Sequence, residues 1–214
     1  MALDLTFEET RVLGSLIEKD MATPEYYPMS LNALLNACNQ KSNREPVVSY
    51  SEDDVLAAVD LLRGRNLVTV LTGGENRVPK YGHRASEILN FDNRELAIVC
   101  VLLLRGPQTV GELKTRTERL KPFDDLDSVE VVLRRLAERD TALQLPRQPG
   151  MREARWAHLM SGPIDVSAMV DHSAPAAAPI TGARRDELAD RVAKLEEEIA
   201  ELKAAFAGFR KQFE

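Results

Sequence analysis

The sequence contains the same order of predicted elements twice: three amphipathic helices followed by two short strands around a turn. In the first copy the helices are expected to be capped by Thr6, Ser30 and Ser51, and apolar residues recur behind each cap at helical spacing. The pattern then changes to the β-branched stretch LVTVL at 67–71, a glycine turn and the returning strand KYGHR. A four-helix bundle would leave this hairpin unexplained. The order instead predicts a winged helix, which is a helix-turn-helix with a β-hairpin as its wing.

The second copy follows in the next seventy or so residues. The caps expected for its three helices are Asn93, the pair Thr109 and Glu112, and the pair Asp127 and Glu130. ALQL at 142–145 and ARWAHL are the expected strands of its hairpin. A shift of 74 residues superimposes the two third helices, because it maps Val55 onto Val129, Val59 onto Leu133, Leu62 onto Leu136 and Arg65 onto Arg139.

We therefore predict a mainly α chain with small β-hairpins (α+β), in which two tandem winged-helix domains occupy residues 1–88 and 89–160. The composition changes after them. The small and Pro-rich stretch SAPAAAPITGA predicts a flexible linker over residues 161–184. A C-terminal coiled-coil helix is expected over residues 185–214.

The evidence for the coiled coil is an unbroken heptad spacing of apolar residues. The predicted oligomerisation residues are Leu188, Val192, Leu195, Ile199, Leu202, Phe206 and Phe209. In a parallel pair, Arg191 faces Glu196 and Glu198 faces Lys203, so the flanking charges are complementary. We predict a homodimer through this helix. The alternative is a single amphipathic helix that packs on its own domains.

The sequence also limits where the protein works. No run of 18 apolar residues exists, so no membrane span is expected, and the start MALDLTFEET lacks the features of a signal peptide. The expected compartment is the cytoplasm. Cys38 and Cys100 both lie in apolar helical patterns and are expected to be buried free thiols.

Catalytic patterns are missing from the sequence. The three histidines are scattered, neither cysteine has a neighbour at metal-ligand spacing, and there is no phosphate-binding or nucleophile motif. The paired acids at 53–54 and 124–125 are expected at helix starts, where the helix dipole favours negative charge. We therefore expect no enzyme, no catalytic residue, no metal and no cofactor.

Nucleic-acid binding is possible but is opposed by the charge pattern. The net charge is −6, and the third helices, which would enter the major groove, begin with the acidic stretches SEDDV and DDLDSVE. Phosphate contacts would then fall to basic residues of the wings. The candidates are Arg77, Lys80 and Arg84 in the first domain and Arg147 and Arg152 in the second.

The stretch LNALLNACNQKSNREP, from Leu31 to Pro46, carries a second stripe of amides beside its leucine stripe. Amides on a face that the core does not need suit recognition of a polar partner. The candidate interaction surface comprises Asn32, Asn36, Asn39, Gln40, Lys41, Asn43 and Arg44. The alternative is local, namely that the amides hold the neighbouring loops in place.

The segment from Glu18 to Val55, with TPEYYP at 23–28 followed by SLNALLNACNQKSNREP, resembles the YceH-like family of uncharacterised bacterial proteins. LLLRGPQTVGELKTRTERL at 102–120 extends the resemblance. It implies two winged-helix domains, no established activity and no catalytic residue to carry over. Two function classes remain: a dimeric adaptor that binds an unidentified protein partner, which we favour, and a DNA-binding transcriptional regulator.

Overall fold

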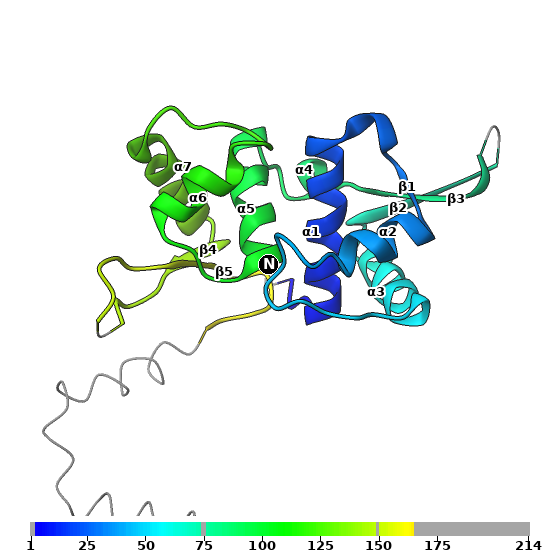
Figure 1. Cartoon of the computed structure of the whole chain (residues 1–214), viewed down its shortest axis with the longest axis horizontal. Coiled ribbons are helices and arrows are strands. Elements are labelled where there is room, and N and C mark those ends of the chain that lie inside the picture. The colour runs from blue at the N-terminus through cyan, green and yellow to red at the C-terminus, as the bar shows by residue number, and fades with distance from the viewer. Residues whose placement is uncertain (1–2, 74–75, 149, 165–214) are drawn as a thin grey trace, which may run out of the picture. The chain divides into compact units, whose positions relative to one another are not determined.

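The computed structural model describes residues 3–73, 76–148 and 150–164 (Figure 1). The predicted coiled coil and most of the predicted linker lie outside these residues. Helices and two small antiparallel sheets make up the described part of the chain, which belongs to one compact unit. None of its helices is long and apolar enough to cross a membrane.

The first repeat has the predicted order of elements with three short additions. Its helices are α1 (Phe7–Ala22), α2 (Leu31–Cys38) and α3 (Glu52–Gly64), and its hairpin is formed by β2 (Val68–Gly73) and β3 (Asn76–His83). The additions are the 3-10 helix η1 (Pro24–Tyr26), the strand β1 (Met29–Ser30) and the helix α4 (Ala85–Ile88). β1 pairs with β3 and gives the sheet order β1-β3-β2. A strand of two residues has no periodicity, so the sequence pattern did not reveal it.

The second repeat follows the same plan. It consists of α5 (Asn93–Arg105), α6 (Val110–Thr117), α7 (Leu126–Glu138), β4 (Ala142–Gln144) and β5 (Trp156–His158). β4 and β5 pair antiparallel. Gln108, just before α6, forms an isolated bridge to Trp156, and this bridge corresponds to the β1–β3 pairing just before α2.

The helix starts confirm most of the predicted caps and correct two of them. Thr6, Ser51 and Thr109 each cap a helix in a capping box, and Ser30 caps α2. Asn93 and Asp127 are not caps, because each already lies inside its helix. The caps are Asp92, in a box with Glu95, and Asp125, in a box with Ser128. In both cases an aspartate one or two residues earlier has the extended backbone that a cap requires.

The core of the compact unit is centred on α1 and α5, which pack side by side (Figure 1). Residues 9–18 and 95–104 are buried without interruption, since each helix contacts its own repeat on one side and the other helix on the opposite side. The two helices are in direct contact at Gly14, whose carbonyl accepts a hydrogen bond of 3.4 Å from the Cys100 thiol. Cys38 and Cys100 are buried free thiols, as predicted.

In each repeat a buried glutamate of the first helix pairs with an arginine that directly follows the third helix. In the first repeat Glu9, from the capping box of α1, lies 3.0 Å from the Nε atom of Arg65, which follows α3. The guanidinium of Arg65 also donates to the carbonyls of Leu3 and Asp4. The chain segment that precedes the first helix is thereby tied to the end of the third.

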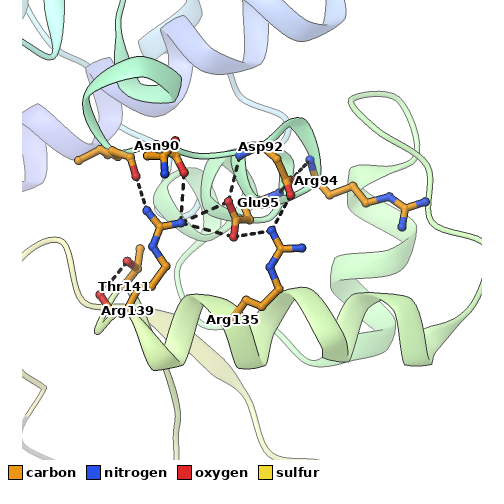
Figure 2. Close-up of polar contacts among 8 residues, drawn as sticks. Asn90, Asp92, Arg94, Glu95, Arg135, Arg139 and Thr141 are labelled. Carbon is orange, nitrogen blue, oxygen red and sulfur yellow. Dashed lines mark hydrogen bonds and ion pairs between the residues drawn. The ribbon is translucent and has the colours of Figure 1, made fainter.

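The second repeat has the same arrangement, with one more arginine (Figure 2). Glu95, from the capping box of α5, lies 3.4 Å from Arg139, whose guanidinium donates to the carbonyls of Leu89 and Asn90. Arg135 adds a further contact of 3.0 Å to Glu95. The 74-residue shift seen in the sequence therefore superimposes Arg65 and Arg139 by role as well as by position.

Candidate functional site

The amide stripe of α2 divides into an exposed part and a structural part. Asn32 and Asn36 are exposed, and their side chains are joined by a hydrogen bond of 3.0 Å from the Nδ2 of Asn36 to the Oδ1 of Asn32. The remaining donor and acceptor positions of this pair face solvent. Lys41 is also exposed, and Gln40 is half-buried.

Asn39 has a structural role. Its Nδ2 donates to the backbone carbonyl of Tyr50 at 2.9 Å, and its Oδ1 accepts from the backbone N–H of Tyr50 at 2.8 Å. This two-way bond closes the loop between α2 and α3. The local interpretation of the amides, that they hold loops in place, applies to this residue.

Arg44 is buried, with none of its side chain exposed to solvent. It lies 2.6 Å from Glu18 of α1 and donates to the carbonyl of Ala37. Burial removes it from the surface on which the sequence pattern had placed it. A second guanidinium, Arg11 of α1, supports the same loop from inside by donating to the carbonyls of Cys38 and Pro46. Sequence position alone does not separate these buried arginines from solvated ones.

Asn43 connects the loop to the second repeat. Its backbone has a φ of +58°, and its Oδ1 accepts a hydrogen bond from Arg105 at the end of α5. Glu18 makes a parallel connection, since it pairs with Arg119 as well as with Arg44. Sequence reasoning did not single out Arg105, because it belongs to the other repeat and only the packing of α1 on α5 brings it here.

Arg105, Arg116 and Arg119 form a group of cations beside this loop. Arg119 pairs with Glu18, and Arg116 lies 3.5 Å from Glu112. Within the described residues Arg105 has no carboxylate partner. Burial lowers the pKa of Arg105, and the nearby charges of Arg116 and Arg119 lower it further.

The predicted nucleic-acid contacts lie on or beside the two hairpins. Lys80 is half-buried on β3, while Arg84 is neutralised by Glu87 at 2.6 Å. The side chain of Arg77 lies outside the described part. Arg147 and Arg152 are exposed on the loop between β4 and β5 and form no ion pair among the described residues.

The third helices present acids and apolar side chains to solvent. At the start of α3, Glu52, Asp53 and Asp54 are all exposed, and Leu61 further along is 51% exposed. On α7, Leu126 is 49% and Val131 is 52% exposed. The exposed cation Arg134 is paired with Glu130 on the same helix at 2.8 Å. The acidic start of α3 has the wrong charge to approach a phosphate backbone, whereas α7 exposes Arg134 and Arg135 together with its apolar side chains.

Burial makes the two thiols poorly reactive. Burial raises the pKa of the Cys38 thiol to about 11 and also raises the pKa of Cys100. His83 is buried, with its Nε2 atom 3.1 Å from Asp20, and its Nδ1 atom accepts a hydrogen bond from the backbone of Ala85. In the part of the chain that the structure describes, no group of three His, Cys, Asp or Glu side chains is placed to hold a metal ion.

The described residues thus define a protein of two similar helical repeats with small antiparallel sheets, whose third helices expose acidic and apolar side chains. The chain belongs to the family described as "Protein of unknown function, DUF480", whose model matches residues 5–151. It is 54% identical over 214 residues to a UPF0502 protein of Solibacter usitatus, and the match covers 100% of both chains.

Two further relatives give the same result. A UPF0502 protein of Aeromonas hydrophila is 52% identical over 201 residues, which cover 92% of this chain and 90% of the relative. A UPF0502 protein of Pelobacter propionicus is 51% identical over 220 residues, and the match covers 100% of both chains. Membership in a family of uncharacterised bacterial proteins is confirmed, while the more specific YceH-like name stays a prediction.

Proposed function

We propose that this chain is a non-catalytic cytoplasmic adaptor, in which two tandem winged helices bind a protein partner and the C-terminal helix forms a homodimer. The domain boundaries are those predicted from the sequence, 1–88 and 89–160. The support for winged helices is the order of three helices and a hairpin in each repeat. A strand or bridge before the second helix, at β1 and at Gln108, adds to that support.

The observation that carries the adaptor role is the solvent-facing side of α7. Leu126 and Val131 are both about half exposed, although each could have been polar without any cost to the core. These two side chains lie at different angles around α7, and exposed apolar side chains beside an ion pair internal to the helix, Arg134 with Glu130, favour a protein partner. The acidic start of α3 opposes the approach that a groove-reading third helix would make to DNA.

A second contact surface is provided by the exposed part of the amide stripe. Asn32, Asn36 and Lys41 supply donors and acceptors that the fold does not use beyond the single bond between the two asparagines. Such groups add orientation and specificity to an apolar contact rather than much affinity. Both surfaces can act in one complex only if the partner spans the two repeats.

The second candidate function is DNA binding through the wings. The observation that favours it is the pair of exposed arginines, Arg147 and Arg152, which have no ion pair among the described residues. Together with Lys80 they could neutralise phosphates without using the third helices. Binding of this kind would be sequence-independent in the main and would weaken steeply with salt.

Site-specific photo-crosslinking in cells tests the adaptor role. A benzophenone amino acid at Val131 is expected to give one discrete protein adduct. The same group at Ile88, which is similarly exposed on α4, is the matched control and is expected to give none. No adduct at position 131, or the same adducts at both positions, would contradict the proposal.

A mobility-shift assay on duplex DNA at low and physiological salt tests the alternative. We expect no shift at physiological salt. Tight binding that weakens steeply with salt, and is lost when Arg77 and Lys80 are both changed to Glu, would establish the DNA-binding function instead.

A further inference from the structure

A cavity of about 680 Å³ lies where the start of α1 and the loop after α2 meet the second repeat. Its volume is in the range of sites that hold small organic molecules. The apolar part of its wall comes from both repeats and consists of Phe7, Pro46, Pro107, Leu145, Pro146 and Met151. The adaptor role proposed above makes no use of this cavity.

Gln108 lines the cavity and has an unused hydrogen-bond acceptor. Its side chain is buried, with the residue only 1% exposed, and its Nε2 donates to the carbonyls of Arg105 at 3.1 Å and Pro107 at 2.9 Å. These bonds fix the orientation of the amide. The Oε1 atom is left without a partner among the described residues. Because a buried acceptor without a partner is unfavourable, a ligand N–H or O–H donated to this oxygen stabilises the complex.

The position of Gln108 is held firmly. Its backbone N–H donates to Trp156 at 2.9 Å, and its backbone carbonyl accepts from Trp156 at 2.7 Å. The backbone of Gln108 is therefore fixed in the wall. Its Oε1 atom is itself closed to solvent, so a ligand donor reaches it after a shift of neighbouring side chains.

Arg105 supplies to the same cavity a positive charge that the nearby carboxylate of Glu45 offsets in part. Two other arginines in the wall, Arg116 and Arg155, are both paired with Glu112, at 3.5 Å and 2.8 Å. Arg105 has no such partner among the described residues and bonds only to the neutral amide of Asn43. A half-buried guanidinium without a carboxylate is a site for an anion.

The other charges in the wall limit how negative that anion can be. Glu45 and Glu153 also line the cavity and are exposed, so they oppose a ligand with two or more negative charges. A phosphate group fits these surroundings less well than a carboxylate or sulfonate.

We propose that this cavity binds a small organic acid with one negative charge and an apolar or aromatic body. The acid group binds Arg105, the body contacts Phe7 and Met151, and an N–H or O–H donor binds the Oε1 atom of Gln108. The ligand contacts both repeats at once, since Phe7 comes from the first and the two polar groups come from the second.

The probe for this site is 8-anilinonaphthalene-1-sulfonate, which combines one sulfonate, an aromatic body and an N–H group. Titration of the full chain, followed by dye fluorescence, is expected to show saturable binding to one site. Arg105→Gln is expected to weaken this binding about tenfold, which corresponds to the loss of one charge-assisted contact. The matched control Arg134→Gln, an exposed arginine of α7 outside the cavity wall, is expected to leave it unchanged.

A second variant keeps the test decisive if Arg105→Gln disturbs the fold. Met151→Asp changes a half-exposed residue of the wall and is expected to weaken dye binding without lowering the melting temperature. Indole-3-acetate is expected to displace the dye and inorganic phosphate is not. The proposal is overturned by the absence of saturable binding, by equal affinity in the cavity variants and the wild type, or by equally effective displacement with phosphate.

Discussion

Arg139 occupies in the second repeat the place that Arg65 occupies in the first: each binds the buried glutamate of a capping box and two carbonyls just before it. The two places differ in one respect. Glu95 forms ion pairs with both Arg139 and Arg135. Glu9 forms an ion pair with Arg65 alone in the described part of the chain.

This difference predicts unequal costs for the same substitution. Arg65→Met leaves a fully buried Glu9 without a cation and is expected to lower the free energy of unfolding by about 3 kcal/mol. Arg139→Met is expected to cost only about 1 kcal/mol, because Arg135 still pairs with Glu95 when Arg139 is removed. Urea denaturation measures both, with Arg134→Met as a control expected within about 0.5 kcal/mol of wild type. Equal losses for the two variants would refute the asymmetry.

A second prediction concerns the contact between α1 and α5. A Cβ atom at Gly14 would lie 2.9 Å from the side chain of Leu104 and 3.1 Å from that of Leu103. Gly14→Ala is therefore expected to lower the free energy of unfolding by about 1–3 kcal/mol through overpacking. Gly111→Ala is the matched control, because nothing lies within 4 Å of its Cβ position in α6, and it is expected to raise stability by up to about 1 kcal/mol. A stabilising Gly14→Ala would show that the two helices can move apart without cost.

Mutation can distinguish the exposed amides of the stripe from the structural one. Asn32→Ala together with Asn36→Ala is expected to change the free energy of unfolding by less than about 0.5 kcal/mol while the crosslink at position 131 or other partner binding is reduced. Asn39→Ala removes both hydrogen bonds to the backbone of Tyr50 and is expected to cost about 1–2 kcal/mol. A large fall in melting temperature for the double variant would assign Asn32 and Asn36 to the scaffold as well.

The free energy of unfolding is expected to decrease at acidic pH because His158 is buried in its neutral form. Burial lowers the pKa of this side chain from 6.5 to about 4. The unfolded state therefore takes up a proton as the pH falls through 6.5, while the folded state resists until about pH 4, so stability is full above 6.5 and is lost progressively below it. The loss is expected to be about 3 kcal/mol at pH 4.

The pH dependence is measured by urea denaturation at several pH values, with His158→Leu as the comparison. The variant is expected to lose most of the slope between pH 6.5 and pH 4. In the wild-type protein the Nδ1 atom of His158 has no hydrogen-bond partner among the described residues. Replacement by leucine therefore leaves no neighbouring group without a partner of that atom. An unchanged slope in the variant would assign the dependence to other groups.

The heptad pattern predicts a dimer in solution. Light scattering of the full chain at micromolar concentration is expected to give twice the mass of 23.9 kDa. Leu195→Lys with Leu202→Lys places charges at two seam positions and is expected to give the single-chain mass. A single-chain mass for the wild-type protein would rule out the coiled-coil dimer at that concentration.

The elements of the fold were readable from the sequence because their signals are local. Periodicity predicted the apolar faces whose buried members include Leu13, Leu34 and Leu133, and capping boxes predicted three helix starts. Where two acceptable caps stood close together, as at Asp92 and Asn93, the local signal was ambiguous. In the structure Asp92, the earlier residue, has the extended backbone of a cap.

The sequence by itself also determined the duplication, since a 74-residue shift superimposes apolar positions that recur at fixed spacing. Only the tertiary structure decided which polar residues face solvent. Arg44 is buried on Glu18 and Asn39 is bonded to Tyr50, whereas Asn32 and Asn36 stay exposed, although all four come from one stretch. Their partners lie far away in the chain: the packing of α1 on α2 brings Glu18 near Arg44, and the packing of α1 on α5 brings Arg105 near Asn43. Helical periodicity is a property of neighbouring residues, but the burial of a charge depends on what the rest of the fold places beside it.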